Sequence, residues 1–190
     1  LYSTRTAGPD CDADRLAGAW DDGRRHEVRA AFTATGLPYA AETLARVERD
    51  LDRFAVGWAR QARVRCEAAQ RDVDLPSSEL GELCLERRRV ELRALVDVFT
   101  RADASTVEHA SAAVERLRDP AQCTDPGVLA SELALAPLPA DRTIAAAVWA
   151  LRERLAGVRF LELAGRYDEG AQQIAPLVDE ARALGHPPAL

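Results

Sequence analysis

Residues 40–73 read AAETLARVERDLDRFAVGWARQARVRCEAAQRDV. Apolar side chains recur in this stretch every three or four residues. They stand at Val47, Leu51, Phe54 and Trp58, and then at Ala62, Cys66 and Ala69. Such a stripe is typical of an amphipathic helix, which would span about 50 Å at the usual rise per residue. The pattern therefore predicts one long helix with a single apolar face.

The segments on both sides of this stretch also have the pattern of helices. A helix over residues 22–35 is predicted, with Asp21 or Asp22 as its N-cap and Gly36 at its end. Residues 79–102 carry apolar side chains on more than one side. A helix with so wide an apolar surface is expected to be central and to have several neighbours.

Shorter helices are predicted in the second half of the chain. Ser105 and Glu108 have the spacing of a capping box, which would open a short helix. Residues 120–139 contain four prolines and are expected to be rich in loops. The last fifty residues predict two helices, over 141–164 and 168–184.

The predicted organisation has four parts. No run of alternating β-branched residues indicates a strand, so the fold class expected is all-α. The parts are an N-terminal linker or arm (1–20), a cysteine-containing helical bundle (21–133), a proline-rich connection (134–140) and a C-terminal helix pair (141–190).

Composition limits the function. The 190 residues are 47% hydrophobic and carry a net charge of −6, which argues against a protein that binds duplex nucleic acid. All 25 basic residues are arginine, so no lysine can form a Schiff base or bind ATP phosphates. The absence of methionine leads us to expect a piece of a longer protein, and the lack of lysine and asparagine indicates a GC-rich bacterial genome. The longest apolar run has eight residues, too few to span a membrane.

The four cysteines do not have the spacing of a metal site. No CxxC pair and no neighbouring pair of histidines is present, so a zinc site is not expected. Two interpretations remain: two disulfides, which require an oxidising compartment, or buried free thiols in a cytosolic bundle. The cysteines are Cys11, Cys66, Cys84 and Cys123.

The expected helix hairpins suggest how disulfides would pair. Antiparallel helices around a turn near residues 102–105 would place Cys84 opposite Cys123. The first interhelical turn would bring Cys66 close to Cys11. The turn between the two long helices would instead place Cys66 opposite Cys84 and leave Cys11 for Cys123. We favour the first arrangement and keep the second as an alternative.

No group of residues has the pattern of an active site. His26, His109 and His186 are far apart in sequence and are expected at the surface or at helix ends. No serine stands in a nucleophile elbow, and carboxylate pairs four residues apart are common on solvated helix faces. No enzymatic activity, cofactor or metal is therefore expected from this segment.

The densest charge cluster is the run from Glu86 to Arg89, followed by Glu91. Inside a central helix, some of these arginines are expected to pair with acidic residues of neighbouring helices. A solvated charged face is the simpler alternative. A site for an anionic ligand is a third.

The C-terminal helix pair resembles the first repeat of a tetratricopeptide array. Residues 165–170 read GRYDEG and are similar to the segment that joins the two helices of that repeat. Gly165, Tyr167 and Gly170 match its positions, with Gly170 in place of the usual alanine, and Ile174 falls at the large apolar position of the second helix. The resemblance implies a bundle that leads into a degenerate first helix pair of a tetratricopeptide-like α-solenoid.

A larger resemblance covers about residues 10–133. It is to the region after the membrane helix in bacterial serine/threonine protein kinases that carry C-terminal tetratricopeptide repeats. The four cysteines take part in it. The other matching segments are Leu16–Asp21, Arg29–Phe32, Thr35–Ala40, Cys66–Ala68, Cys84–Arg88 and Glu91–Val98.

This resemblance implies a non-enzymatic sensor or protein-interaction region on the extracytoplasmic side of a bacterial membrane, because no kinase motif lies in this chain. Its partners would be a protein or peptide bound on helical surfaces, or a second copy in a homodimer. Contact with the membrane would come only through a span outside the chain. The alternative is a cytosolic tetratricopeptide-type scaffold or regulator with reduced cysteines.

Overall fold

The computed structural model describes Cys11 and residues 15–71, 78–135 and 139–185. In these residues the chain forms seven α-helices and one short 3-10 helix, and no strand, so the expected all-α class is confirmed. The helices are α1 (Asp22–Ala34), α2 (Ala40–Gln70), α3 (Ser78–Phe99), α4 (Ala104–Glu115), η1 (Pro120–Thr124), α5 (Pro126–Leu135), α6 (Arg142–Leu163) and α7 (Tyr167–Ala183).

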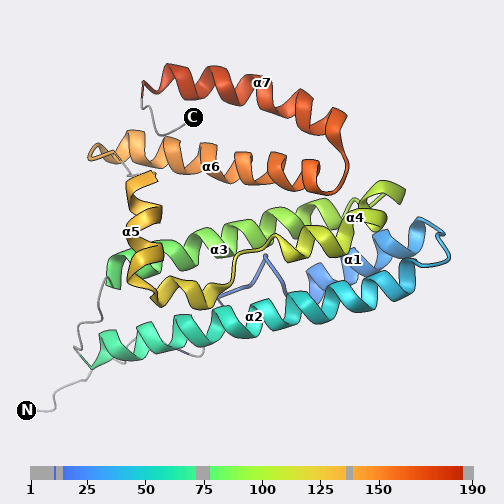
Figure 1. Cartoon of the computed structure of the whole chain (residues 1–190), viewed down its shortest axis with the longest axis horizontal. Coiled ribbons are helices and arrows are strands. Elements are labelled where there is room, and N and C mark those ends of the chain that lie inside the picture. The colour runs from blue at the N-terminus through green and yellow to red at the C-terminus, as the bar shows by residue number, and fades with distance from the viewer. Residues whose placement is uncertain (1–10, 12–14, 72–77, 136–138, 186–190) are drawn as a thin grey trace, which may run out of the picture.

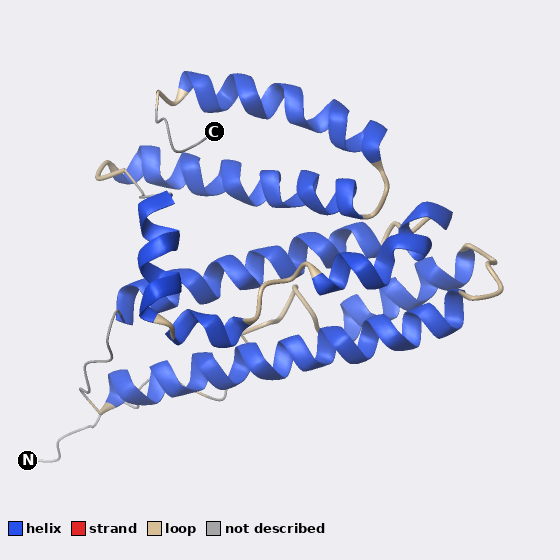
Figure 2. Cartoon of the chain, viewed as in Figure 1, coloured by secondary structure: helices blue, strands red, loops and turns tan. Residues whose placement is uncertain are grey.

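The long helices lie one above another (Figures 1 and 2). α2 and α3 run antiparallel, and α1 and α4 pack against them at the end where α2 begins. α6 lies along α3, and α7 returns antiparallel along α6. α5 runs steeply between the lower helices and the start of α6.

α3 is the central helix, as its wide apolar surface predicts. Leu92, Leu95, Val96 and Phe99 are fully buried, and the Phe99 ring meets the edge of Phe32 with ring centroids 5.6 Å apart. α3 contacts every other helix except α7 extensively. The main apolar core therefore surrounds α3.

The core continues into the C-terminal helix pair. Phe160 and Leu161 of α6, and Ala164 directly after it, belong to the same buried cluster as residues of α1 to α4. A second, smaller cluster lies between α6 and α7. The predicted division at residues 134–140 stays a prediction, because 136–138 lie outside the described residues.

The buried face of α2 agrees with the predicted stripe as far as Ala62 and then differs from it. Beyond that point Arg65 and Ala68 are buried, whereas Cys66 is half-buried and Ala69 is exposed. The neighbour of this end of α2 is η1, and the Arg65 guanidinium donates to the Cys123 carbonyl oxygen at 2.7 Å. The packing of η1 therefore explains which side chains of α2 are buried after Ala62.

The start of α4 corrects the predicted capping box. Asp103 is the N-cap, and its carboxylate accepts hydrogen bonds from the backbone N–H and the hydroxyl of Thr106, both at 2.8 Å. Ser105 lies within the helix, and its hydroxyl donates to the Ala164 carbonyl oxygen at 3.3 Å. An aspartate two residues earlier thus supplies the cap that the sequence pattern assigned to serine.

The stretch expected to be rich in loops is largely helical. Pro120 begins η1 and Pro126 begins α5, and each follows an aspartate that accepts hydrogen bonds from the first turn. Proline is favoured at the first position of a helix because the N–H that it lacks has no intrahelical partner there. These prolines therefore mark helix starts, and the prediction of loops was wrong for residues 120–135.

The longest apolar run of the sequence forms the first half of α6. Val148 and Leu151 are buried, and Ile144 is 37% exposed. Within the described residues, no helix has both the length and the apolar character that crossing a membrane requires.

Candidate functional site

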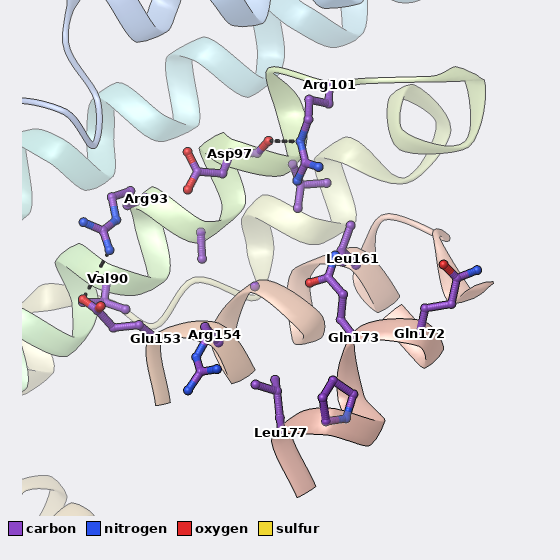
Figure 3. Close-up of a pocket in the computed structure, with 14 residues that line it drawn as sticks. Val90, Arg93, Asp97, Arg101, Glu153, Arg154, Leu161, Gln172, Gln173 and Leu177 are labelled. Carbon is purple, nitrogen blue, oxygen red and sulfur yellow. Dashed lines mark hydrogen bonds and ion pairs between the residues drawn. The ribbon is translucent and has the colours of Figure 1, made fainter. Parts of the chain in front are cut away.

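A groove of about 490 Å³ lies between α3, α6 and α7. We call it the α3–α7 groove, and Figure 3 shows its lining residues. Its floor is apolar: Val90 and Val98 come from α3, Leu161 from α6 and Leu177 from α7. These side chains stand side by side because each belongs to the face of its helix that is turned toward the other two.

Gly157 gives the groove part of its width. A β-carbon built on this α6 residue would have no other atom within 4 Å, so a side chain here would extend into open space. Glycine in a helix interior costs about 1 kcal/mol relative to alanine. The residue thus lowers helix stability where it leaves room in the groove.

The rim of the groove is polar and electrically balanced. Arg93 lies 3.3 Å from the Glu153 carboxylate across the α3–α6 contact, and the two side chains approach each other in Figure 3. Arg101 donates to Glu169 at 3.3 Å, and Asp97 pairs with Arg24 of α1. A balanced rim over an apolar floor suits an uncharged or mixed-charge partner surface better than a polyanion.

On the outer side of the groove, Arg154 of α6 donates to Glu180 of α7 at 2.5 Å. This hydrogen bond raises the pKa of Arg154 and lowers the pKa of Glu180, so both groups remain charged over the ordinary pH range. Both side chains are about half exposed, and the pair contributes little to stability.

The turn between α6 and α7 positions α7, which is the third wall of the α3–α7 groove. Gly165 has φ +74°, and a β-carbon there would lie 2.3 Å from the Ser105 hydroxyl oxygen. Both the backbone conformation and the close approach of Ser105 therefore require glycine. The Arg166 backbone N–H closes the turn by donating to the Leu161 carbonyl oxygen at 2.8 Å.

The other residues of the tetratricopeptide-like motif occupy different environments. Gly170 is buried against Val158 and Leu161, with room for the β-carbon of the usual alanine at 3.8–3.9 Å. Ile174 is half-buried, whereas Tyr167 is 63% exposed. The segment that carries this motif joins α6 and α7, which form an antiparallel helix pair.

The charge cluster of α3 is divided between two environments. Arg89 pairs with Glu86 on the partly exposed side of the helix. Arg88 is fully buried, and its guanidinium lies 3.7 Å from the Glu91 carboxylate. Glu91 also accepts hydrogen bonds from Arg118 and lies 3.6 Å from Arg159 of α6. Acidic partners on neighbouring helices were expected for these arginines, but the pairs described for Arg88 and Arg89 lie within α3. The ion pairs between segments run the other way, from Arg118 and Arg159 to Glu91 of α3.

Two disulfides tie the bundle. The structure joins Cys11 to Cys66 and Cys84 to Cys123, with Cα–Cα distances of 5.5 and 5.6 Å. This is the arrangement that we favoured from the hairpin geometry. The first bond fixes the N-terminal segment to the end of α2, and the second fixes η1 to α3.

The remaining candidate residues do not form a site. His26 is exposed and His109 is half-buried with its Nδ1 2.9 Å from the Ser105 carbonyl oxygen, and His186 lies outside the described residues. Trp20 and Trp58 are buried and donate to Asp52 and to the Leu85 carbonyl oxygen. Among the described residues, no three His, Cys, Asp or Glu side chains are grouped to hold a metal ion.

Comparison of this chain with models of protein families, with curated proteins and with solved structures finds no match. The groove was not predicted from the sequence, because its walls come from segments about sixty to eighty residues apart whose mutual position no local pattern gives. The glycine at position 157, inside an otherwise strong helical pattern, was the one local signal of an unfilled space.

Proposed function

We propose that this chain is a non-enzymatic sensor or protein-interaction region of a receptor-like bacterial serine/threonine kinase, on the extracytoplasmic side of the membrane. Binding of a ligand or partner protein would change the association of the kinase and hence its signalling. The observation that supports the extracytoplasmic assignment is the pair of disulfides, because such bonds form and persist in oxidising compartments. The kinase context rests on the resemblance of residues 10–133.

The α3–α7 groove is the surface that we assign to the partner. Its volume of about 490 Å³, apolar floor and balanced rim suit a peptide segment that inserts apolar side chains. In the same proposal, α6 and α7 are the first helix pair of a tetratricopeptide-like solenoid, whose inner surface would extend this groove.

The compartment is tested by counting thiols. The protein is produced with an export signal in a bacterial periplasm, alkylated with and without prior reduction, and analysed by mass spectrometry. We expect no free thiol before reduction, and peptides that link Cys11 to Cys66 and Cys84 to Cys123. Four thiols that stay free after export would contradict the extracytoplasmic assignment and favour the cytosolic scaffold with reduced cysteines.

The groove is tested with a tryptophan at position 157. The G157W side chain would start in open space and extend into the groove, since no atom of a neighbouring element lies within 4 Å of where its β-carbon would stand. G57W is the matched control: Gly57 of α2 is equally open but lines a different hollow, between α2 and α4. The readout is autophosphorylation, in its native host, of the protein that contains this chain.

We expect G157W to reduce the autophosphorylation response to the level of a variant that lacks residues 11–185, a loss of at least threefold. G57W should behave as the wild type. If the deletion leaves phosphorylation unchanged, the sensor role is wrong. If the deletion has an effect but G157W has none, the partner binds elsewhere.

A further inference from the structure

The two disulfides differ in how deeply they are buried. Cys84 is 2% exposed and Cys123 is fully buried, and both belong to the main core cluster. Cys11 and Cys66 are each only half-buried. A thiolate that cleaves a disulfide must reach one of its two sulfur atoms, so burial slows the attack. The Cys11–Cys66 bond is therefore the one that an external thiol reaches without opening the core.

Chain entropy does not separate the two bonds in the same way. The bonded cysteines are 55 and 39 residues apart in sequence, and the entropy of closing a loop changes slowly with its length. Access to the sulfur atoms therefore decides which bond a reductant breaks first.

The Cys11–Cys66 bond holds the N-terminal segment, which we define as Cys11 and residues 15–20, against the second half of α2. Four residues after Cys11, the Arg15 guanidinium lies over the Trp58 ring, 5.8 Å from its centroid. Arg15 and Trp58 also line a hollow of about 350 Å³ between α2 and α3. Breaking the bond would remove the covalent tie that holds Arg15 near this ring.

The rest of the bundle has attachments that do not depend on this bond. Trp20 is buried in the main core, and its indole donates to Asp52 of α2 at 2.8 Å. The Arg65 guanidinium donates to the Cys123 carbonyl oxygen, so α2 stays joined to η1. Reduction of the outer bond would therefore free the start of the N-terminal segment and leave the helices in place.

We propose that Cys11–Cys66 is a redox switch, which a dithiol reduces while Cys84–Cys123 stays oxidised, and whose reduction uncovers Trp58. One thiolate of the dithiol attacks a sulfur of the bond and forms a mixed disulfide, and the second thiol then displaces the protein. The dithiol becomes a disulfide, and Cys11 and Cys66 each end as a thiol, so two electrons and two protons pass to the protein. This role rests on the extracytoplasmic assignment of the proposed function, since an oxidising compartment keeps both bonds formed at rest.

The test uses the purified full chain, oxidised in vitro with glutathione disulfide so that the outcome does not depend on the compartment. Dithiothreitol is the probe under native conditions. Free thiols are trapped by alkylation at successive times and located by mass spectrometry. We expect Cys11 and Cys66 to become alkylated at least tenfold faster than Cys84 and Cys123. In denaturing urea, which exposes both bonds, the two rates should approach each other.

Trp58 reports the structural effect. In protein labelled with 5-fluorotryptophan, fluorine NMR should give one resonance for each of the three tryptophans, assigned with single Trp-to-Phe variants. Selective reduction should shift the Trp58 resonance, and C11S/C66S should reproduce that shift without any reductant. Trp149 of α6 is the internal reference, whose resonance should not move.

R15A separates the loss of Arg15 from other effects of reduction. The oxidised variant should already show the shifted Trp58 resonance, because the ring has lost the guanidinium above it. R46A is the matched control, since Arg46 lies near the start of α2 and pairs with Glu42. It should leave the Trp58 resonance at its wild-type position.

Reduction of both bonds at the same rate, or of Cys84–Cys123 first, would overturn the proposal. Selective reduction that leaves the Trp58 resonance in place would do so as well. The proposed function is tested separately: four free thiols in the exported protein contradict the extracytoplasmic assignment, whereas equal reduction rates contradict only the switch.

Discussion

At the scale of single residues, Asp103 determines how α4 begins. Its carboxylate accepts both hydrogen bonds that Thr106 can donate to it, and Arg166 lies 3.9 Å away. Partial burial alone would raise the pKa of Asp103, but the Thr106 hydrogen bonds and the charge of Arg166 outweigh it and hold the pKa below the ordinary value of 3.8. The charged form is thus the one that stabilises the folded protein.

Replacing this cap should therefore destabilise the protein in a pH-dependent way. We expect D103A to lower the free energy of unfolding by about 1 kcal/mol near neutral pH. Because the folded-state pKa is lowered, the wild-type advantage is complete above pH 3.8 and is lost as the pH falls through the lower folded-state value. Urea denaturation of both proteins at pH 7 and at pH 3 measures the difference.

S105A is the control for this prediction. Ser105 has the position of the cap in the sequence pattern. The hydrogen bond described for its hydroxyl, however, goes to the Ala164 carbonyl oxygen in the α6–α7 turn. S105A should cost clearly less than D103A at neutral pH and should show no comparable pH dependence. A larger effect of S105A than of D103A would mean that the capping box was correctly predicted.

At the scale of elements, the periodicity of apolar residues predicted which face of a helix is buried, but it did not predict how a neighbouring element changes that face. α2 follows its apolar stripe while it faces α3 and α4, and departs from it where Arg65 reaches the Cys123 carbonyl oxygen of η1. α5 was missed because proline was read as a loop signal, although at a first helical position it is compatible with a helix.

The candidate sites were predictable only in part, for a related reason. Arg87 stood out as part of a charge cluster, but its place beside Arg152 and Trp149 depends on α6 lying along α3. The disulfide pairing could be favoured from the sequence, since hairpin symmetry about two marked turns gives it, although the turn between the two long helices gave Cys66–Cys84 as an alternative. Contacts between segments joined by short turns can be predicted in this way, whereas contacts between distant helices cannot.

At the scale of the whole molecule, stability should be unevenly distributed. Both disulfides lie before residue 124, and the large core surrounds α3. α7 packs mainly on α6, through a small cluster to which α7 contributes Leu177 and Ala181. Few buried apolar contacts and no covalent tie lower the free energy of local opening. We therefore expect α7 to open while α1 to α4 stay folded.

Native-state hydrogen exchange with L177A tests this expectation. Truncation of a buried leucine costs about 2–5 kcal/mol, and here the loss should appear in the exchange of α7 amides while α3 amides keep their protection. L95A is the control, because Leu95 is fully buried in the main core and its truncation should lower the protection of the amides of α1 to α4, whose exchange requires that core to open. Equal losses in α3 and α7 for L177A would show that the molecule unfolds as one cooperative unit. An α7 that opens separately could open the α3–α7 groove to a partner without disturbing the disulfide-tied bundle beneath it.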